Sequence, residues 1–126
     1  MPSSFTAPSG LCFRTSSTPL AVDLEEFDAL RVGGDKVLLH WSTASEIDNA
    51  GFQILREPWR PTATSIPSAT ATLVTTGLVQ AEGSPFQETR YRWRDDSAQS
   101  GEAYNYWLVD IDLYGVPTHH GPISVR

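Results

Sequence analysis

The sequence is poor in the residues from which small proteins build covalent or metal-bound frameworks. It contains one cysteine, Cys12, which excludes an internal disulfide, a four-cysteine zinc site and a Cys-x-x-Cys redox pair. No apolar run approaches the roughly 18 residues that a membrane-spanning helix needs. Residues 1–22 also lack the basic start and the unbroken apolar stretch of a signal peptide. We therefore expect no membrane insertion and no signal peptide in this chain.

Positive charge is scarce as well. The 126 residues include 9 Lys and Arg against 15 Asp and Glu, which gives a net charge of −6. Nucleic acids and anionic membranes both favour a basic surface, so we expect no nucleic-acid partner. The length suits one domain with its own core, and the hydrophobic fraction of 40% is typical of a folded globular chain.

Motifs of common chemistry are absent from the sequence. It has no phosphate-binding loop, no G-x-G-x-x-G, no G-x-S-x-G and no EF-hand spacing. The adjacent His119 and His120 point to opposite faces of a strand, so they do not readily chelate one ion. We therefore expect no catalytic residues, no enzyme activity, no cofactor and no metal site.

What the sequence does have is a succession of short alternating segments separated by turn residues. Seven such segments, at intervals of about 8–15 residues, predict an all-β antiparallel sandwich, because no crossover helices are available to join parallel strands. The segments are residues 21–32, 36–43, 51–57, 73–80, 89–94, 103–111 and 116–125.

At the first of these segments, the spacing of the apolar residues fits a helix as well as a strand. Leu20, Leu24, Phe27 and Leu30 are three or four residues apart, as on one face of a helix. The segment precedes a Gly-Gly turn and a clear strand, which favours a first strand instead.

Two blocks of the sequence carry a family resemblance. VLLHWSTASEIDNAGFQILR and SGEAYNYWLVDIDLYGVPTHHGPISV resemble the fibronectin type III-like modules of bacterial secreted and cell-surface proteins. The resemblance covers residues 21–126 and leaves residues 1–20 outside as an arm or linker. It implies an extracellular or cell-surface location and a role as a spacer, an adhesion unit or a ligand-binding platform.

The resemblance also implies roles for particular residues. Trp41 matches the core tryptophan of the second strand. Tyr104 matches the tyrosine whose hydroxyl bonds back to the preceding turn, the tyrosine corner. Together with Phe52, Tyr106 and Leu108, these two side chains are the expected structural core.

The densest acidic set has two interpretations. Its members are Glu46, Asp48, Asn49, Asp110 and Asp112. We expect Glu46, Asn49 and Asp110 to form one structural polar cluster, because a semi-buried Asp110 needs hydrogen bonds. The alternative is a Ca²⁺ site, for which six to eight oxygen atoms must converge.

The tryptophans raise a second functional hypothesis. Trp59 lies in the proline-rich residues 58–70, and Trp107 alternates with the presumed core residues of its strand. Both are candidates for an exposed aromatic platform that binds polysaccharide, which would make the chain a carbohydrate-binding module. The alternative is that arginine side chains shield Trp107.

Residues 1–20 are rich in Ser, Thr and Pro, yet Phe5, Leu11 and Phe13 all fall on odd positions. That alternation is typical of a strand with one apolar face. We expect this arm to add to an edge strand of a neighbouring copy, and so to build a filament-type assembly. A plain linker and an arm that folds back onto its own domain are the alternatives. The expected partner is accordingly a protein or another copy of the chain.

Overall fold

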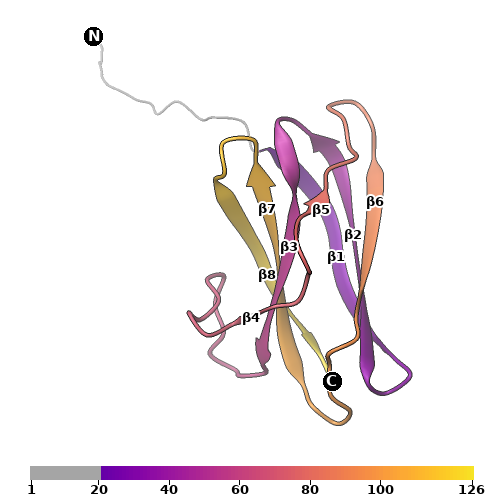
Figure 1. Ribbon diagram of the computed structural model, residues 1–126, viewed down its shortest axis with the longest axis vertical. Coiled ribbons are helices and arrows are strands. Elements are labelled where there is room, and N and C mark those ends of the chain that lie inside the picture. The colour runs from indigo at the N-terminus through magenta and orange to yellow at the C-terminus, as the bar shows by residue number, and fades with distance from the viewer. Residues whose placement is uncertain (1–20) are drawn as a thin grey trace.

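Two antiparallel sheets lie face to face in residues 21–126, the part of the chain that the computed structural model describes (Figure 1). The three-stranded sheet has the order β1-β2-β6, and the five-stranded sheet has the order β4-β3-β7-β8 with β5 also paired to β3. The strands are β1 Val22–Val32, β2 Lys36–Glu46, β3 Asn49–Pro58, β4 Thr72–Leu73, β5 Val79–Gln80, β6 Thr89–Asp95, β7 Tyr104–Asp112 and β8 Pro117–Val125. The predicted all-β antiparallel sandwich is confirmed.

The segment with the ambiguous period is strand β1, and a β-bulge explains its spacing. Leu24 pairs with Thr43 and Glu26 with Ser42, so Glu25 is an extra residue in the ladder. The extra residue turns both Leu24 and Phe27 toward the core, although they are three residues apart. A bulged strand can therefore imitate the period of a helix.

The predicted strand over residues 73–80 is interrupted. It forms two short strands, β4 and β5, which both pair with β3. Between them the Val74 N–H donates to the Ile54 carbonyl oxygen at 2.8 Å, so the chain stays attached to β3. The backbone of β5 approaches β3 closely at Gly51, because a Cβ on this residue would lie 2.3 Å from the Val79 carbonyl oxygen.

An aromatic cluster fills the centre of the core. The Trp41 ring stacks on Tyr91 with centroids 5.4 Å apart and meets Phe52 edge-on at the same distance. Trp41 and Tyr91 come from the three-stranded sheet and Phe52 from the five-stranded sheet, so the cluster joins the two layers. All five expected core residues are buried, including Tyr106 and Leu108 on β7.

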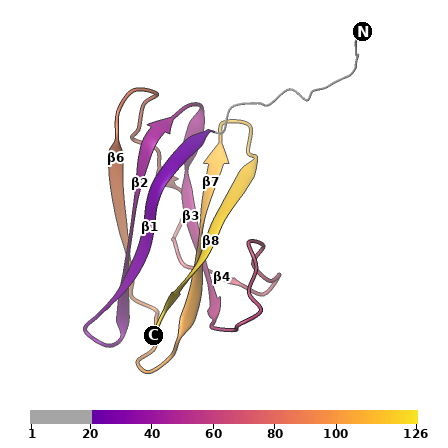
Figure 2. The ribbon, with the colours of Figure 1, turned by 180° about the vertical axis from the view of Figure 1, so that it is seen from behind.

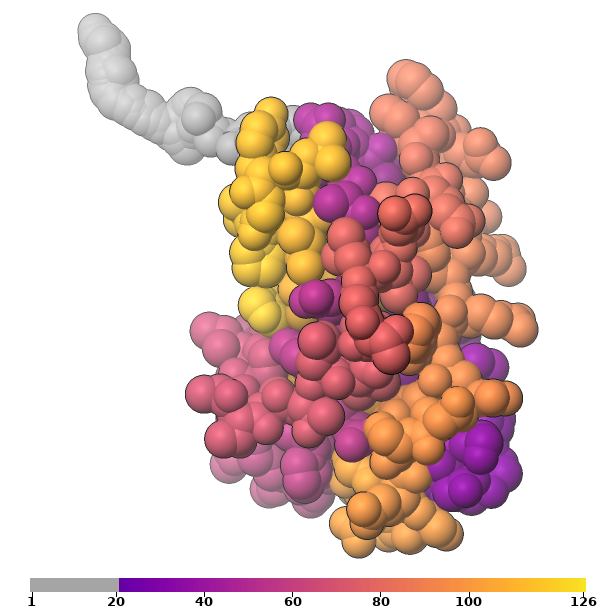
Figure 3. Space-filling model, in the orientation of Figure 1, coloured from indigo at the N-terminus to yellow at the C-terminus, as the bar shows by residue number. Residues whose placement is uncertain are grey.

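Strand β7 is buried on both of its faces. The inner face contacts the core, and the chain that follows β3 lies over the outer face. Figure 3 shows this segment, in rose, on the surface of the molecule. The Trp107 Nε1–H donates to the Thr64 carbonyl oxygen at 3.0 Å, and the Asn105 amide donates to the Arg60 carbonyl oxygen at 3.3 Å. Within residues 21–126 there is no helix long and apolar enough to cross a membrane.

Candidate functional site

The turn before β7 is held by Tyr104. The Gln99 backbone N–H donates to the Tyr104 hydroxyl oxygen at 3.0 Å, and the ring is 6% exposed. The Arg56 guanidinium lies over the same ring, 4.7 Å from its centroid. Nearby, the Arg31 guanidinium donates to the Gly34 carbonyl oxygen at 2.7 Å and to that of Gln99 at 3.2 Å. This end of the sandwich is therefore fastened by side chains as well as by strand pairing.

Removing the hydroxyl group tests that role of Tyr104. We expect Tyr104→Phe to lower the free energy of unfolding by about 1–3 kcal/mol, because the Gln99 N–H loses its acceptor. Chemical denaturation of both proteins measures the difference. Tyr114→Phe is the matched control, since Tyr114 is 84% exposed. An equal midpoint for wild type and Tyr104→Phe contradicts the role.

The carboxylate of Glu46 is the centre of a buried polar cluster at the opposite end. Its Oε2 accepts from the Thr43 hydroxyl at 2.8 Å and the Tyr91 hydroxyl at 2.6 Å, and its Oε1 accepts from the Asn49 amide at 2.9 Å. Burial and the bond to Glu46 raise the pKa of Tyr91. A Cβ on Gly83 would lie 2.2 Å from Glu46 Oε2, so a larger residue at this position would displace the Glu46 side chain from its hydrogen bonds. The expected contact between Glu46 and Asn49 is present.

Asp110 is not part of that cluster, and the expected three-residue group is wrong in this respect. Asp110 is 2% exposed, and its Oδ2 lies 2.6 Å from His120 Nε2 on the neighbouring strand β8. Asp110 does face inward, as expected, but its partner differs. The register shift in β8 places His120 on the same face of the sheet and within reach of Asp110. The rest of the acidic set is divided too, since Asp112 Oδ1 accepts from the backbone N–H groups of Tyr114 and Val116.

These contacts lead to a prediction about chelators. We expect Asp110→Ala to destabilise the protein by about 1–3 kcal/mol, because it leaves the partly buried His120 without its partner. EDTA is expected to leave the unfolding midpoint of the wild type unchanged. Thermal unfolding of both proteins, with and without EDTA, measures both effects. A midpoint that falls with EDTA would support the calcium interpretation instead.

Another buried carboxylate, that of Asp95, connects the two sheets. Its Oδ2 accepts from Arg56 Nη1 on β3 and from the Tyr106 hydroxyl on β7, both at 2.7 Å. Its Oδ1 accepts from the Ser97 hydroxyl at 2.6 Å and the Ser97 N–H at 3.0 Å. Burial acts to raise the pKa of Asp95, but the bonds from Ser97, Tyr106 and Arg56 outweigh it and the pKa is lowered. Burial and the bond to Asp95 raise the pKa of Tyr106.

The tryptophan platform does not form. Trp107 is fully buried beneath the loop that follows β3, so neither exposure nor an arginine shield applies to it. Trp59 is 38% exposed, and the Arg126 guanidinium covers its ring at 4.8 Å from the centroid. The prediction failed because alternation assigns Trp107 to the outer face of the sheet but does not show that the loop folds over that face.

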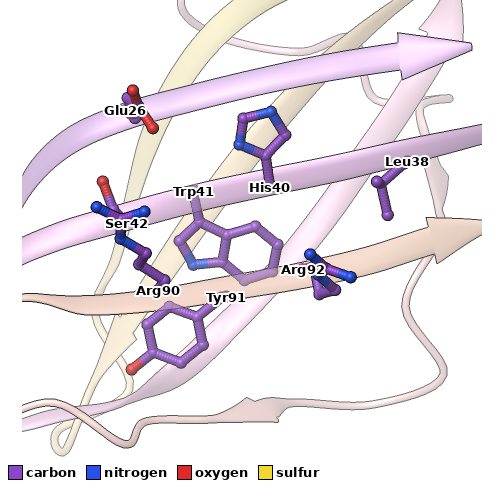
Figure 4. A pocket seen from close by; sticks show the side chains of 8 residues that line it. All are labelled: Glu26, Leu38, His40, Trp41, Ser42, Arg90, Tyr91 and Arg92. Carbon is purple, nitrogen blue, oxygen red and sulfur yellow. The ribbon is translucent and has the colours of Figure 1, made fainter.

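Charged and polar side chains also gather on the outer face of the three-stranded sheet. A hollow of about 340 Å³ lies there between β1 and β6. Glu26 on β1 and Arg90 and Arg92 on β6 flank His40 and Ser42 of β2 (Figure 4). The sequence contains a signal of this face. The three arginines of β6 alternate with Tyr91 and Trp93, so they fall on the opposite face of the strand from these aromatic residues.

A three-stranded sheet packed on a larger antiparallel sheet, with a tyrosine corner before the penultimate strand, defines a fibronectin type III-like fold. The chain is similar in structure to a Fn3-like protein from Clostridium thermocellum, known from its crystal structure, with a TM-score of 0.53 and 15% sequence identity. The match covers 85% of this chain and 94% of that one. No protein-family model matches the sequence, and no curated protein does. The predicted resemblance is therefore confirmed at the level of the fold.

Proposed function

We propose that this chain is a noncatalytic interaction module of an extracellular bacterial protein, and that residues 1–20 join copies by adding a strand to the free edge of β6. The observation that carries the proposal is that edge. Strand β6 is seven residues long, contains no proline and pairs with β2 without a register shift. Along its other side, no strand of residues 21–126 is paired.

The other sheet edges are less suited to accept a strand. Strand β1 carries two register shifts, and β8 contains Pro117 and Pro122 together with a shift of its own. Strands β4 and β5 are two residues long each. Bulges, prolines and short length are the features by which proteins protect their edges. Among the described strands, β6 is therefore the edge best able to extend the sheet.

The apolar pattern of the arm matches what this edge exposes. Trp93 is only partly buried and contacts the margin of the core, and a hollow of about 420 Å³ lies beside it. A donated strand would place Phe5, Leu11 and Phe13 on one face, and one of them can cover Trp93. Donation from copy to copy is heterologous and does not close, so it builds a chain.

The noncatalytic part of the proposal rests on the fold and on what the buried carboxylates do. Fibronectin type III-like folds typically serve as spacers and binding modules. Glu46, Asp95 and Asp110 each hold strands together through hydrogen bonds inside the domain. The extracellular setting rests on the sequence resemblance alone.

Light scattering on three proteins tests the proposal: the full chain, a truncation that lacks residues 1–19, and the full chain with F5S/L11S/F13S. We expect the mass of the full chain to grow with concentration beyond that of a dimer. Neither variant should grow beyond a dimer, and both should stay folded by circular dichroism. A full chain that is monomeric at millimolar concentration contradicts strand donation. A monomer that loses stability on truncation shows instead that the arm packs on its own domain.

A further inference from the structure

The outer face of the three-stranded sheet is divided into an acidic half and a basic half. Directly opposed residues on neighbouring strands point to the same face of a sheet. The strand register places three such rows across the face seen from behind (Figure 2). The rows are Glu26–Ser42–Arg90, Asp28–His40–Arg92 and Leu30–Leu38–Arg94. Strand β1 thus carries carboxylates on this face, while β6 carries guanidinium groups.

These charges are largely unused within the domain. Strands β1 and β6 lie on either side of β2, about 9–10 Å apart, and within residues 21–126 no ion pair joins them. Arg90 makes an exposed ion pair with Glu88 at 3.8 Å, and Arg94 makes one with Asp96 at 2.7 Å. Within residues 21–126, no ion pair involves Glu26, Asp28 or Arg92. The face therefore offers both signs of charge to a partner.

We propose that this face binds the same face of a second copy of the chain. A two-fold axis parallel to the strands and above β2 places β1 of each copy over β6 of the other. Glu26 then faces the second copy's Arg90, and Asp28 faces its Arg92, and both contacts occur twice. The opposite arrangement, with the axis across the strands, places carboxylates on carboxylates. Charge therefore selects one closed, isologous dimer.

The size of the face sets the strength of this contact. Seven paired rows across three strands cover roughly 330 Å². A stable interface buries about 800 Å² on each partner. Leu30 is 59% exposed and adds some apolar contact. The dimer is accordingly weak, and salt weakens it further.

The contact uses the face of the sheet and leaves the β6 edge free, so it is independent of strand donation. To separate the two, the test uses the full chain with F5S/L11S/F13S as its background. Two charge-reversal proteins are made in that background, E26R/D28R and R90E/R92E. In either one alone, like charges meet across the two-fold axis. In a mixture, the arginines introduced on β1 meet the glutamates introduced on β6, and the remaining native halves also match.

We expect sedimentation equilibrium to show a dimer for the background protein and a monomer for each charge-reversal protein at the same concentration. An equimolar mixture recovers the dimer as a heterodimer, and its formation shifts amide NMR signals of β1, β2 and β6. The control D35R/E102R reverses two exposed acids in turns away from the face and remains dimeric. A monomeric background protein overturns the proposal. Charge-reversal proteins that still dimerise, or a mixture that stays monomeric, overturn it as well.

Discussion

Replacement of Asp95 by alanine is expected to lower the free energy of unfolding by about 4 kcal/mol. The change leaves the Arg56 guanidinium, whose side chain is 11% exposed, without its counter-ion and the Tyr106 hydroxyl without its acceptor. Breaking a buried ion pair from one side is strongly destabilising, because an uncompensated charge remains in the interior. Urea denaturation measures the loss, provided that the slope with urea concentration is unchanged.

The neighbouring Asp96 provides a matched control. Its ion pair with Arg94 is as short, at 2.7 Å, but both side chains are more than half exposed. Exposed pairs contribute little, so Asp96→Ala is expected to cost less than about 1 kcal/mol. Equal losses for the two alanine variants would show that burial is not the cause.

The lowered pKa of Asp95 adds a dependence on pH. Its folded-state pKa lies below the ordinary value of 3.8, so the unfolded chain takes up a proton at this position first as the pH falls. The stabilisation is fully present well above pH 3.8 and is lost as the pH falls through the folded-state value. The difference in stability between wild type and Asp95→Asn should therefore shrink in acid.

Replacement of Glu46 by alanine is expected to cost about 3 kcal/mol. Three donors lose their acceptor at once: the hydroxyls of Thr43 and Tyr91 and the amide of Asn49. Hydrogen bonds to a charged group contribute about 1.5–3 kcal/mol, and orphaned buried donors add their desolvation cost. Thermal and urea denaturation measure the loss.

Two further variants separate the carboxylate from the simple loss of volume. Glu46→Gln keeps the size and one oxygen acceptor, so its loss should be intermediate. Glu82→Ala removes an exposed carboxylate from the same region, where only the Glu82 backbone N–H contacts the cluster. Its effect should be small. If Glu46→Ala were as mild as Glu82→Ala, the cluster would not stabilise the fold.

The sequence predicts the sheets better than the contacts between side chains. Alternation located strands such as β2 and β6 because one face of each is buried. The contact between Glu46 and Asn49 was expected from the polar residues that follow the predicted strand over residues 36–43. Asp110 was placed with the wrong partner, because the register of β8 shifts between His120 and Ile123. Gly121 and Pro122 lie at this shift, and such residues within a strand often mark a bulge. The cover over Trp107 was missed for a similar reason, because it depends on the path of a proline-rich loop.

The ion pair between Arg56 and Asp95 was missed although a signal exists. Arg56 continues the face of Phe52 and Ile54, and Asp95 continues the face of Tyr91 and Trp93. Two opposite charges that both fall in the inward register of their strands must find a partner inside the fold. Which strands meet is a property of the topology, so the pairing itself could be read only from the structure.

The positions of the two ends of residues 21–126 have a mechanical consequence. Val22 lies where β2 ends, while Val125 pairs with Tyr104 at the other end of the sandwich (Figure 1). A pull applied to both ends therefore acts along β1 and β8, parallel to their strand axes. Such a load shears the β1–β2 and β7–β8 ladders, so that many hydrogen bonds resist together instead of opening one after another. The same domain pulled across its strands should yield at a lower force.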